Sequence, residues 1–174
     1  MSIMQHCHHT LIALQFIEFN TPISIVAAET GLSAGKIRKL YIEQTGHLPP
    51  RGMLPFSADW YLQWRPNIHA SLFANLYIDL IDAPLTSQQR LITAYRHYLS
   101  ELACFDDGEV LISMARAWTL LRFCRSHMLQ LTPCYRCSAL YLSAAFQPSS
   151  SFVCGICHTP SHAGHRHRPK RRTV

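Results

Sequence analysis

Four cysteines near the end of the chain constrain its folding more than any other feature. Cys134 and Cys137 form one Cys-x-x-Cys pair, Cys154 and Cys157 form a second, and sixteen residues separate the two pairs. A two-residue gap lets both thiolates of a pair turn toward one point. Two facing pairs then place four sulfur atoms at the corners of a tetrahedron. The spacing therefore predicts a closed, structural zinc site with one Zn²⁺ per chain.

The stretch between the pairs, residues 138–153, is long enough for one short β-hairpin. Its expected parts are a first strand over residues 140–146, a turn at residues 148–150 and a returning strand at residues 152–153. Together with the cysteines these parts predict a zinc ribbon. Many zinc knuckles place glycine directly after the second cysteine, because a left-handed backbone costs glycine little. Here Ser138 and His158 hold those positions.

Disulfide bonds or unused thiols are the alternatives for these cysteines, and disulfides need an oxidising compartment. The first ten residues lack the basic start, apolar core and cleavage site of an export signal, and the total of seven cysteines is odd. The sequence also has no apolar run long enough to span a bilayer. We therefore expect a cytoplasmic protein that has no membrane partner and binds metal through its paired cysteines.

Charge is distributed unevenly along the chain. Residues 1–109 carry all ten acidic residues and a net charge of −3, whereas residues 110–174 carry nine Arg or Lys, no acid and a net charge of +9. Such a positive half attracts polyanions, and nucleic acid is the first candidate. The alternative is a solubilising tail. The basic tail, residues 161–174, has no apolar periodicity and is expected to be disordered alone. Its predicted phosphate contacts are Arg166, Arg168, Lys170, Arg171 and Arg172.

Residues 22–45 have the spacing of a helix-turn-helix. Thr21 and Pro22 suit the start of a first helix, Gly31 suits the turn, and Ser33 suits the cap of a second helix over residues 34–45. Ala27 and Ile37 suit the contact between the two helices. The second helix would present its cations to DNA, and these are Lys36, Arg38 and Lys39. Plain packing of two short helices explains the same pattern equally well.

The remaining periodicity predicts a mostly α fold. Further helices are expected at residues 6–19, at 57–64 with Trp60 and Trp64 on one face, at 67–81, at 87–102 and at 109–127. The intervening apolar segment 47–56 contains three prolines, which exclude a helix. We expect this loop to be pressed onto the core or covered by a partner. The predicted division is a helical DNA- and partner-binding domain over 1–129, the zinc ribbon over 130–160 and the basic tail.

Several blocks resemble the FlhC family of flagellar transcriptional activators. They are residues 52–57, 60–64, 67–71 and 115–120, followed by the four cysteines. The resemblance implies a subunit that assembles with the smaller helical protein FlhD as a heterohexamer of two FlhC and four FlhD. It further implies binding to double-stranded promoter DNA of flagellar class 2 operons and activation of sigma-70 RNA polymerase. The zinc of the family carries over onto Cys134, Cys137, Cys154 and Cys157.

Two other functional classes are weighed against this one. The run from Pro133 to Cys137 is half of the zinc deaminase signature, which also needs an upstream His-x-Glu. The sequence has no such triplet, and a second cysteine pair would fill the open position that catalysis requires. We therefore expect no enzyme. The other alternative is a non-catalytic zinc adaptor that binds proteins without contacting DNA.

Overall fold

The computed structural model describes residues 2–103, 109–146 and 149–161. The elements in chain order are α1 (Ile3–Glu18), α2 (Ile23–Thr30), α3 (Ala34–Thr45), the 3₁₀ turn η1 (Asp59–Leu62), α4 (Trp64–Ile78), α5 (Ser87–Leu102), α6 (Met114–Arg125), β1 (Leu129–Pro133), β2 (Leu140–Ala144) and the 3₁₀ turn η2 (Ser149–Ser151). The prediction of a mostly α-helical chain with a four-cysteine cluster near its C-terminal end is confirmed. The predicted loop at 104–108 and most of the basic tail lie outside the described residues.

The first three helices form the expected helix-turn-helix shape, with α1 packed against both α2 and α3. Gly31 adopts the left-handed conformation that ends α2, and the Ser33 hydroxyl caps α3 as predicted. The predicted cap at Thr21 is wrong. Its hydroxyl donates to the carbonyl of Phe16 at 2.6 Å, so Thr21 closes the end of α1, and the backbone of Pro22 precedes α2 without a side-chain cap.

Helix α4 begins earlier than its sequence suggests. The predicted start after Pro66 is wrong, because α4 begins at Trp64 and contains Pro66 in its first turn. The first turn of a helix has no intrahelical partners for its N–H groups, so the missing N–H of proline costs nothing there. Trp60 consequently lies in η1 and Trp64 in α4, rather than both on one helix.

The last two helices follow the capping signals of the sequence. Thr86 and Gln89 form the predicted capping box at the start of α5. Helix α6 begins at Met114, capped by the Ser113 hydroxyl, and ends at Arg125. It is therefore shorter at both ends than the predicted 109–127. No helix within the described ranges has both the length and the apolarity needed to cross a membrane.

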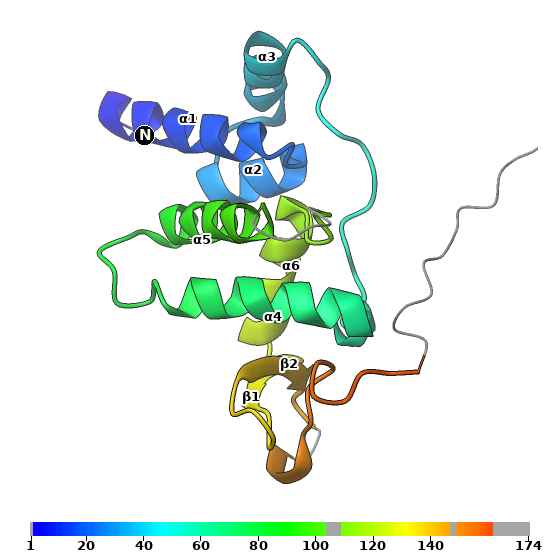
Figure 1. Ribbon diagram of the computed structural model, residues 1–174. Helices are drawn as coiled ribbons and strands as arrows, with labels where there is room; N and C mark the ends of the chain where they lie inside the picture. The colour runs from blue at the N-terminus through cyan, green and yellow to red at the C-terminus, as the bar shows by residue number, and fades with distance from the viewer. Residues whose placement is uncertain (1, 104–108, 147–148, 162–174) are drawn as a thin grey trace, which may run out of the picture.

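Helix α4 lies between α5 and the β-hairpin, and α6 runs past α4 to reach β1 (Figure 1). One side of α4 packs against α5 and α6, where Phe73, Tyr98 and Leu120 are fully buried. Its other side packs against β2. The single hydrophobic core runs from α1 through α6 and reaches Leu129 of β1 and Leu142 of β2. The hairpin is therefore attached to the helical body through α4, through α6, which contacts β1, and through η1, which contacts β2.

The hairpin itself is paired differently from the prediction. Strand β2 pairs antiparallel with β1, which precedes the first cysteine pair, with Leu129 opposite Ala144 and Pro133 opposite Leu140. The predicted returning strand at 152–153 is wrong, and Phe146 is 93% exposed rather than part of a strand. The first Cys-x-x-Cys pair thus occupies the turn of the hairpin. The second pair approaches it on a separate loop.

Candidate metal centre

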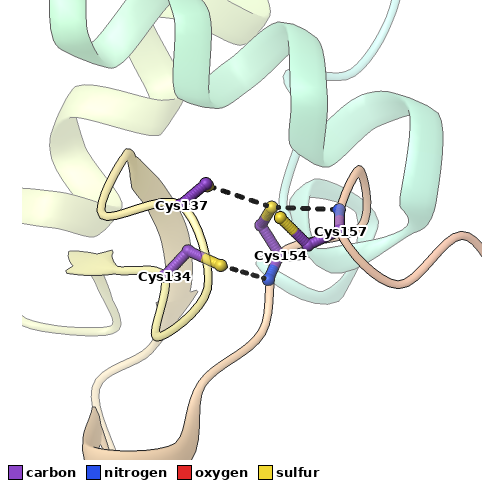
Figure 2. A group of neighbouring side chains, drawn as sticks. All are labelled: Cys134, Cys137, Cys154 and Cys157. Atoms are coloured by element: carbon purple, nitrogen blue, oxygen red, sulfur yellow. Dashed lines mark hydrogen bonds between the residues drawn. The ribbon is translucent and has the colours of Figure 1, made fainter.

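The sulfur atoms of Cys134, Cys137, Cys154 and Cys157 all lie within 4.8 Å of one another. Figure 2 shows the side chains of the two pairs converging from opposite sides, with the Sγ atoms of Cys137 and Cys154 3.9 Å apart. Cys134 and Cys154 are buried, whereas Cys137 is exposed. The structure therefore brings together all four cysteines that the spacing selected, and none of them forms a disulfide.

The two pairs are held by turns that are closed by the same kind of hydrogen bond. The N–H of Ser138 donates to the carbonyl of Cys134 at 2.8 Å, and the N–H of His158 donates to the carbonyl of Cys154 at 3.0 Å. Each turn folds the backbone of its pair around the sulfur atoms. A further bond, from the N–H of Tyr135 to the carbonyl of Phe152 at 2.8 Å, ties the first turn to the loop that carries the second.

Ser138 takes the conformation for which glycine is better suited. Its φ is +60°, in the left-handed region. For an L-residue this conformation costs about 1–2 kcal/mol relative to the right-handed one. The lack of glycine after Cys137 therefore has a cost, since the turn requires a positive φ at Ser138. The second turn does not carry this cost, because the φ of His158 is not positive.

Backbone donors already favour thiolate sulfur in the cluster. The N–H of Cys154 lies 3.3 Å from Sγ of Cys134, and the N–H of Cys157 lies 3.4 Å from Sγ of Cys154. The first of these bonds is the largest cause that lowers the pKa of Cys134 to about 6. The thiol of Cys157, which donates to Cys137 and Cys154, has a raised pKa. Four cysteines in contact cannot all lose their protons without repulsion between the thiolates, and a bound cation would offset that repulsion.

The donor set fits a closed zinc site. Zinc bonds thiolate sulfur at about 2.3 Å, which makes the edge of a tetrahedron about 3.8 Å. The sulfur atoms lie up to 4.8 Å from one another, so the most distant pair must approach by about 1 Å to match that edge. Four cysteines fill the four positions of a structural site and leave none for a reacting water. The arrangement can therefore brace the fold, and it offers no open metal position.

Helix α4 holds the metal site through Trp64. The indole N–H of Trp64 donates to the carbonyl of Gly155 at 2.8 Å, between the two cysteines of the second pair. A Cβ atom on Gly155 would lie only 2.7 Å from Cδ1 of Trp64. The close approach of the Trp64 ring therefore requires glycine at this position. The backbone angle does not require it, because the φ of Gly155 is not positive.

The same helix covers the outer edge of β2 with polar side chains. The amides of Asn67 and Asn75 donate to the carbonyls of Leu142 and Leu140, at 2.8 Å and 3.0 Å. Between them the hydroxyl of Ser71 accepts from the N–H of Leu142 at 2.9 Å. We call Trp64, Asn67, Ser71 and Asn75 the α4 seam. Sequence reasoning missed its role, although polar residues recurring every four positions along one face of a helix are a usable signal.

Of the predicted nucleic-acid contacts, the structure describes those on α3, which lies at the other end of the helical body from the β-hairpin (Figure 1). Arg38 and Lys39 are exposed on α3. Lys36 is half-buried, and its ammonium group donates to Nε2 of His6 on α1, so it points toward the neighbouring helix. The tail cations Arg166, Arg168, Lys170, Arg171 and Arg172 lie outside the described residues. The cations of α3 do not converge on the cysteine cluster (Figure 1).

Comparison with known proteins gives one consistent result. The sequence model of the family described as "Flagellar transcriptional activator (FlhC)" matches residues 1–170. The flagellar transcriptional regulator FlhC of Yersinia enterocolitica is 42% identical over 165 residues, which cover 93% of this chain and 84% of that protein. The FlhC of Paraburkholderia atlantica is 40% identical over 179 residues, covering 99% of this chain and 82% of that protein.

Proposed function

Because this chain belongs to the FlhC family of flagellar transcriptional activators, we propose that it is the DNA-binding subunit of a promoter-binding complex. In this proposal it assembles with FlhD as a heterohexamer of two FlhC and four FlhD. The complex binds promoter DNA of flagellar class 2 operons and recruits sigma-70 RNA polymerase, in the cytoplasm. The observation that carries the proposal is the family match along residues 1–170.

The helix-turn-helix geometry supports a role in DNA binding. Ile25, Val26 and Ile37 are fully buried where α2 and α3 meet, which leaves the opposite face of α3 to solvent. Lys39 lies on that face, and Arg38 is exposed beside it, next to Pro22 and Ile23 at the start of α2. The second helix of such a motif is the one that enters the major groove. Lys36 is assigned a lesser part, because its ammonium group is held by His6.

The proposed metal is one structural Zn²⁺ bound by Cys134, Cys137, Cys154 and Cys157. When bound, zinc would supply a tetrahedral cross-link between the turn of the hairpin and the second loop. The protein's own contribution is to orient the four sulfur atoms through backbone N–H groups and through the α4 seam. In this proposal the chain performs no catalysis.

A promoter-binding titration tests the proposal. The zinc-loaded complex with FlhD is titrated against a fluorescent flagellar promoter duplex and a scrambled duplex at several salt concentrations. Arg38→Ala and Lys39→Ala should each weaken binding and each lower the slope of log K against log salt by about 1. Arg96→Ala is the matched control, because Arg96 lies on α5 in an exposed pair with Glu18 and should leave that slope unchanged.

The same titration separates the tail from α3. Removal of residues 166–174 deletes five cations, so the salt slope should become shallower while preference for the promoter sequence persists. A slope that the truncation leaves unchanged contradicts the role of the tail. If the complex binds neither duplex at any salt concentration, the adaptor alternative is favoured and the proposed function is wrong.

A further inference from the structure

An apolar groove lies between the proline-containing loop and α6. It has a volume of about 380 Å³, and its apolar lining includes Leu54, Pro55, Phe56, Trp118, Phe123 and Met128. Phe56 is 79% exposed and Met128 is 47% exposed. Large apolar side chains grouped around one hollow are a common mark of a protein-binding surface.

The loop is built to present this surface. Pro49 is buried, so this end of the loop is fixed to the body. This agrees with the expectation that the loop is pressed onto the core. Its outer side exposes Leu48 and Met53, which is 86% exposed, in addition to Phe56. Proline restricts the backbone before binding, which lowers the entropy lost when a partner docks. The loop is therefore anchored to the core on one side and presents apolar groups on the other, and its cover by a partner stays a prediction.

An arginine lines the groove. The guanidinium of Arg122 lies 4.7 Å from the ring of Trp118, and both residues belong to the lining. Arg125 is exposed at the end of the same helix. Glu29 is the acidic group nearest to Trp118, and its carboxylate accepts from the indole N–H at 2.6 Å. Glu29 also lines a small hollow together with Arg122 and Arg125, whereas the described lining of the groove itself contains Arg122 and no acidic residue, so the groove carries a positive charge.

Charge narrows the choice of occupant. The tail of this chain carries five cations between residues 166 and 172, so it would be repelled from the groove. A second copy would bring the same positive charge against itself. Nucleic acid would satisfy the arginines, but its phosphates gain nothing from Phe56, Met53 or Met128. A peptide segment with apolar side chains on one face and carboxylates beside them fits both the apolar lining and the arginine side chains.

We propose that this groove docks an acidic, amphipathic segment of a partner protein. The apolar face of the segment would cover Phe56 and Met128, and its carboxylates would pair with Arg122 and Arg125. This inference goes beyond promoter binding, because it concerns a surface formed by α6 and the loop rather than by α3. An activator needs protein contacts as well as DNA contacts, and this surface supplies one.

Two peptide probes test the proposal on the zinc-loaded full chain. Both are fluorescein-labelled amphipathic helices of about four turns with leucine and phenylalanine on one face. One has glutamate on its other face and the other has lysine. The acidic probe should bind about tenfold more tightly than the basic probe, measured by anisotropy, as two partly exposed charge pairs allow. Arg122→Glu should reverse the order of the two probes.

Phe56→Ser should weaken both probes, because it removes the apolar contact that they share. The matched controls are Phe146→Ser, since Phe146 is a comparably exposed phenylalanine outside the groove, and Arg38→Glu on α3. Neither control should alter either affinity. Equal affinity for the two probes, insensitivity to Phe56→Ser, or displacement of the acidic probe by duplex DNA would each overturn the proposal. The promoter titration of the complex can succeed or fail independently of all these results.

Discussion

Replacement of Gly155 by alanine tests whether α4 holds the metal site. The new Cβ would lie 2.7 Å from Cδ1 and 3.1 Å from Nε1 of Trp64, closer than real Cβ contacts allow. The Trp64 ring must therefore move, and its 2.8 Å hydrogen bond to the carbonyl of residue 155 must lengthen or break. Because the backbone angle of Gly155 is not in the left-handed region, the whole effect comes from this contact.

The size of the effect follows from two contributions. Overpacking a well-filled site costs about 1–3 kcal/mol, and loss of one hydrogen bond costs about 1 kcal/mol. We expect Gly155→Ala to lower the free energy of unfolding of the zinc-loaded chain by about 2–4 kcal/mol. It should also speed transfer of zinc to a chromogenic chelator, since residue 155 lies between the two cysteines of the second pair. Urea denaturation followed by circular dichroism measures the first quantity.

A double-mutant cycle with Trp64→Ala gives the decisive comparison. Without the indole ring, the added methyl group at residue 155 has no neighbour to meet, so the two changes together should cost less than their sum by at least about 1 kcal/mol. Gly35→Ala is the control, because a Cβ at Gly35 meets nothing within 4 Å. That change should be neutral or stabilising by up to about 1 kcal/mol, as glycine is a poor helix former. Strict additivity of Gly155→Ala and Trp64→Ala would refute the reasoning.

Three further outcomes are expected. Cys134→Ser should lower bound zinc, measured by atomic absorption, together with solubility, and a variant that keeps its fold without metal contradicts a structural role. Ser138→Gly should raise the free energy of unfolding by about 1 kcal/mol, because it removes left-handed strain at φ +60°; an unchanged urea midpoint argues against that strain. Burial and then Arg65 lower the pKa of His69, whose Nδ1 lies 2.9 Å from the Tyr98 hydroxyl. Unfolding therefore takes up a proton below about pH 6.5, so stability should fall as pH drops through this range, and His69→Gln should flatten the fall in pH-dependent urea midpoints.

Local signals in the sequence predicted most of the helical part. Gly31, Ser33 and Gly46 bound α2 and α3 where expected, because caps and left-handed glycines depend only on neighbouring backbone. The capping box at Thr86 worked for the same reason. Pro66 misled the prediction, since proline breaks a helix interior but is tolerated in a first turn. The sequence alone does not say which of these two positions it holds.

The cysteine spacing predicted the cluster but not the sheet around it. Four thiols at fixed separations define a tetrahedron whatever the intervening chain does, so the cluster did not depend on the hairpin. The pairing of β2 depends on contacts that the hairpin prediction did not include. Strand β1 pairs with one edge of β2 and the α4 seam bonds the other, so neither edge of β2 is left for residues 152–153. Such long-range competition leaves little trace in a local pattern.

A two-stranded sheet alone is marginal in water, because it exposes both edges and one whole face. Here β2 has one edge paired with β1 and the other bonded by Asn67, Ser71 and Asn75. The cysteine cluster closes the end of the hairpin, and Trp64 joins that cluster to the first turn of α4. Bound zinc would therefore stabilise, from the opposite side, the same few residues that α4 packs against. The boundary placed between residues 129 and 130 stays a prediction, and a fragment beginning at residue 130 would keep most of β1 but lack Leu129 and the α4 seam.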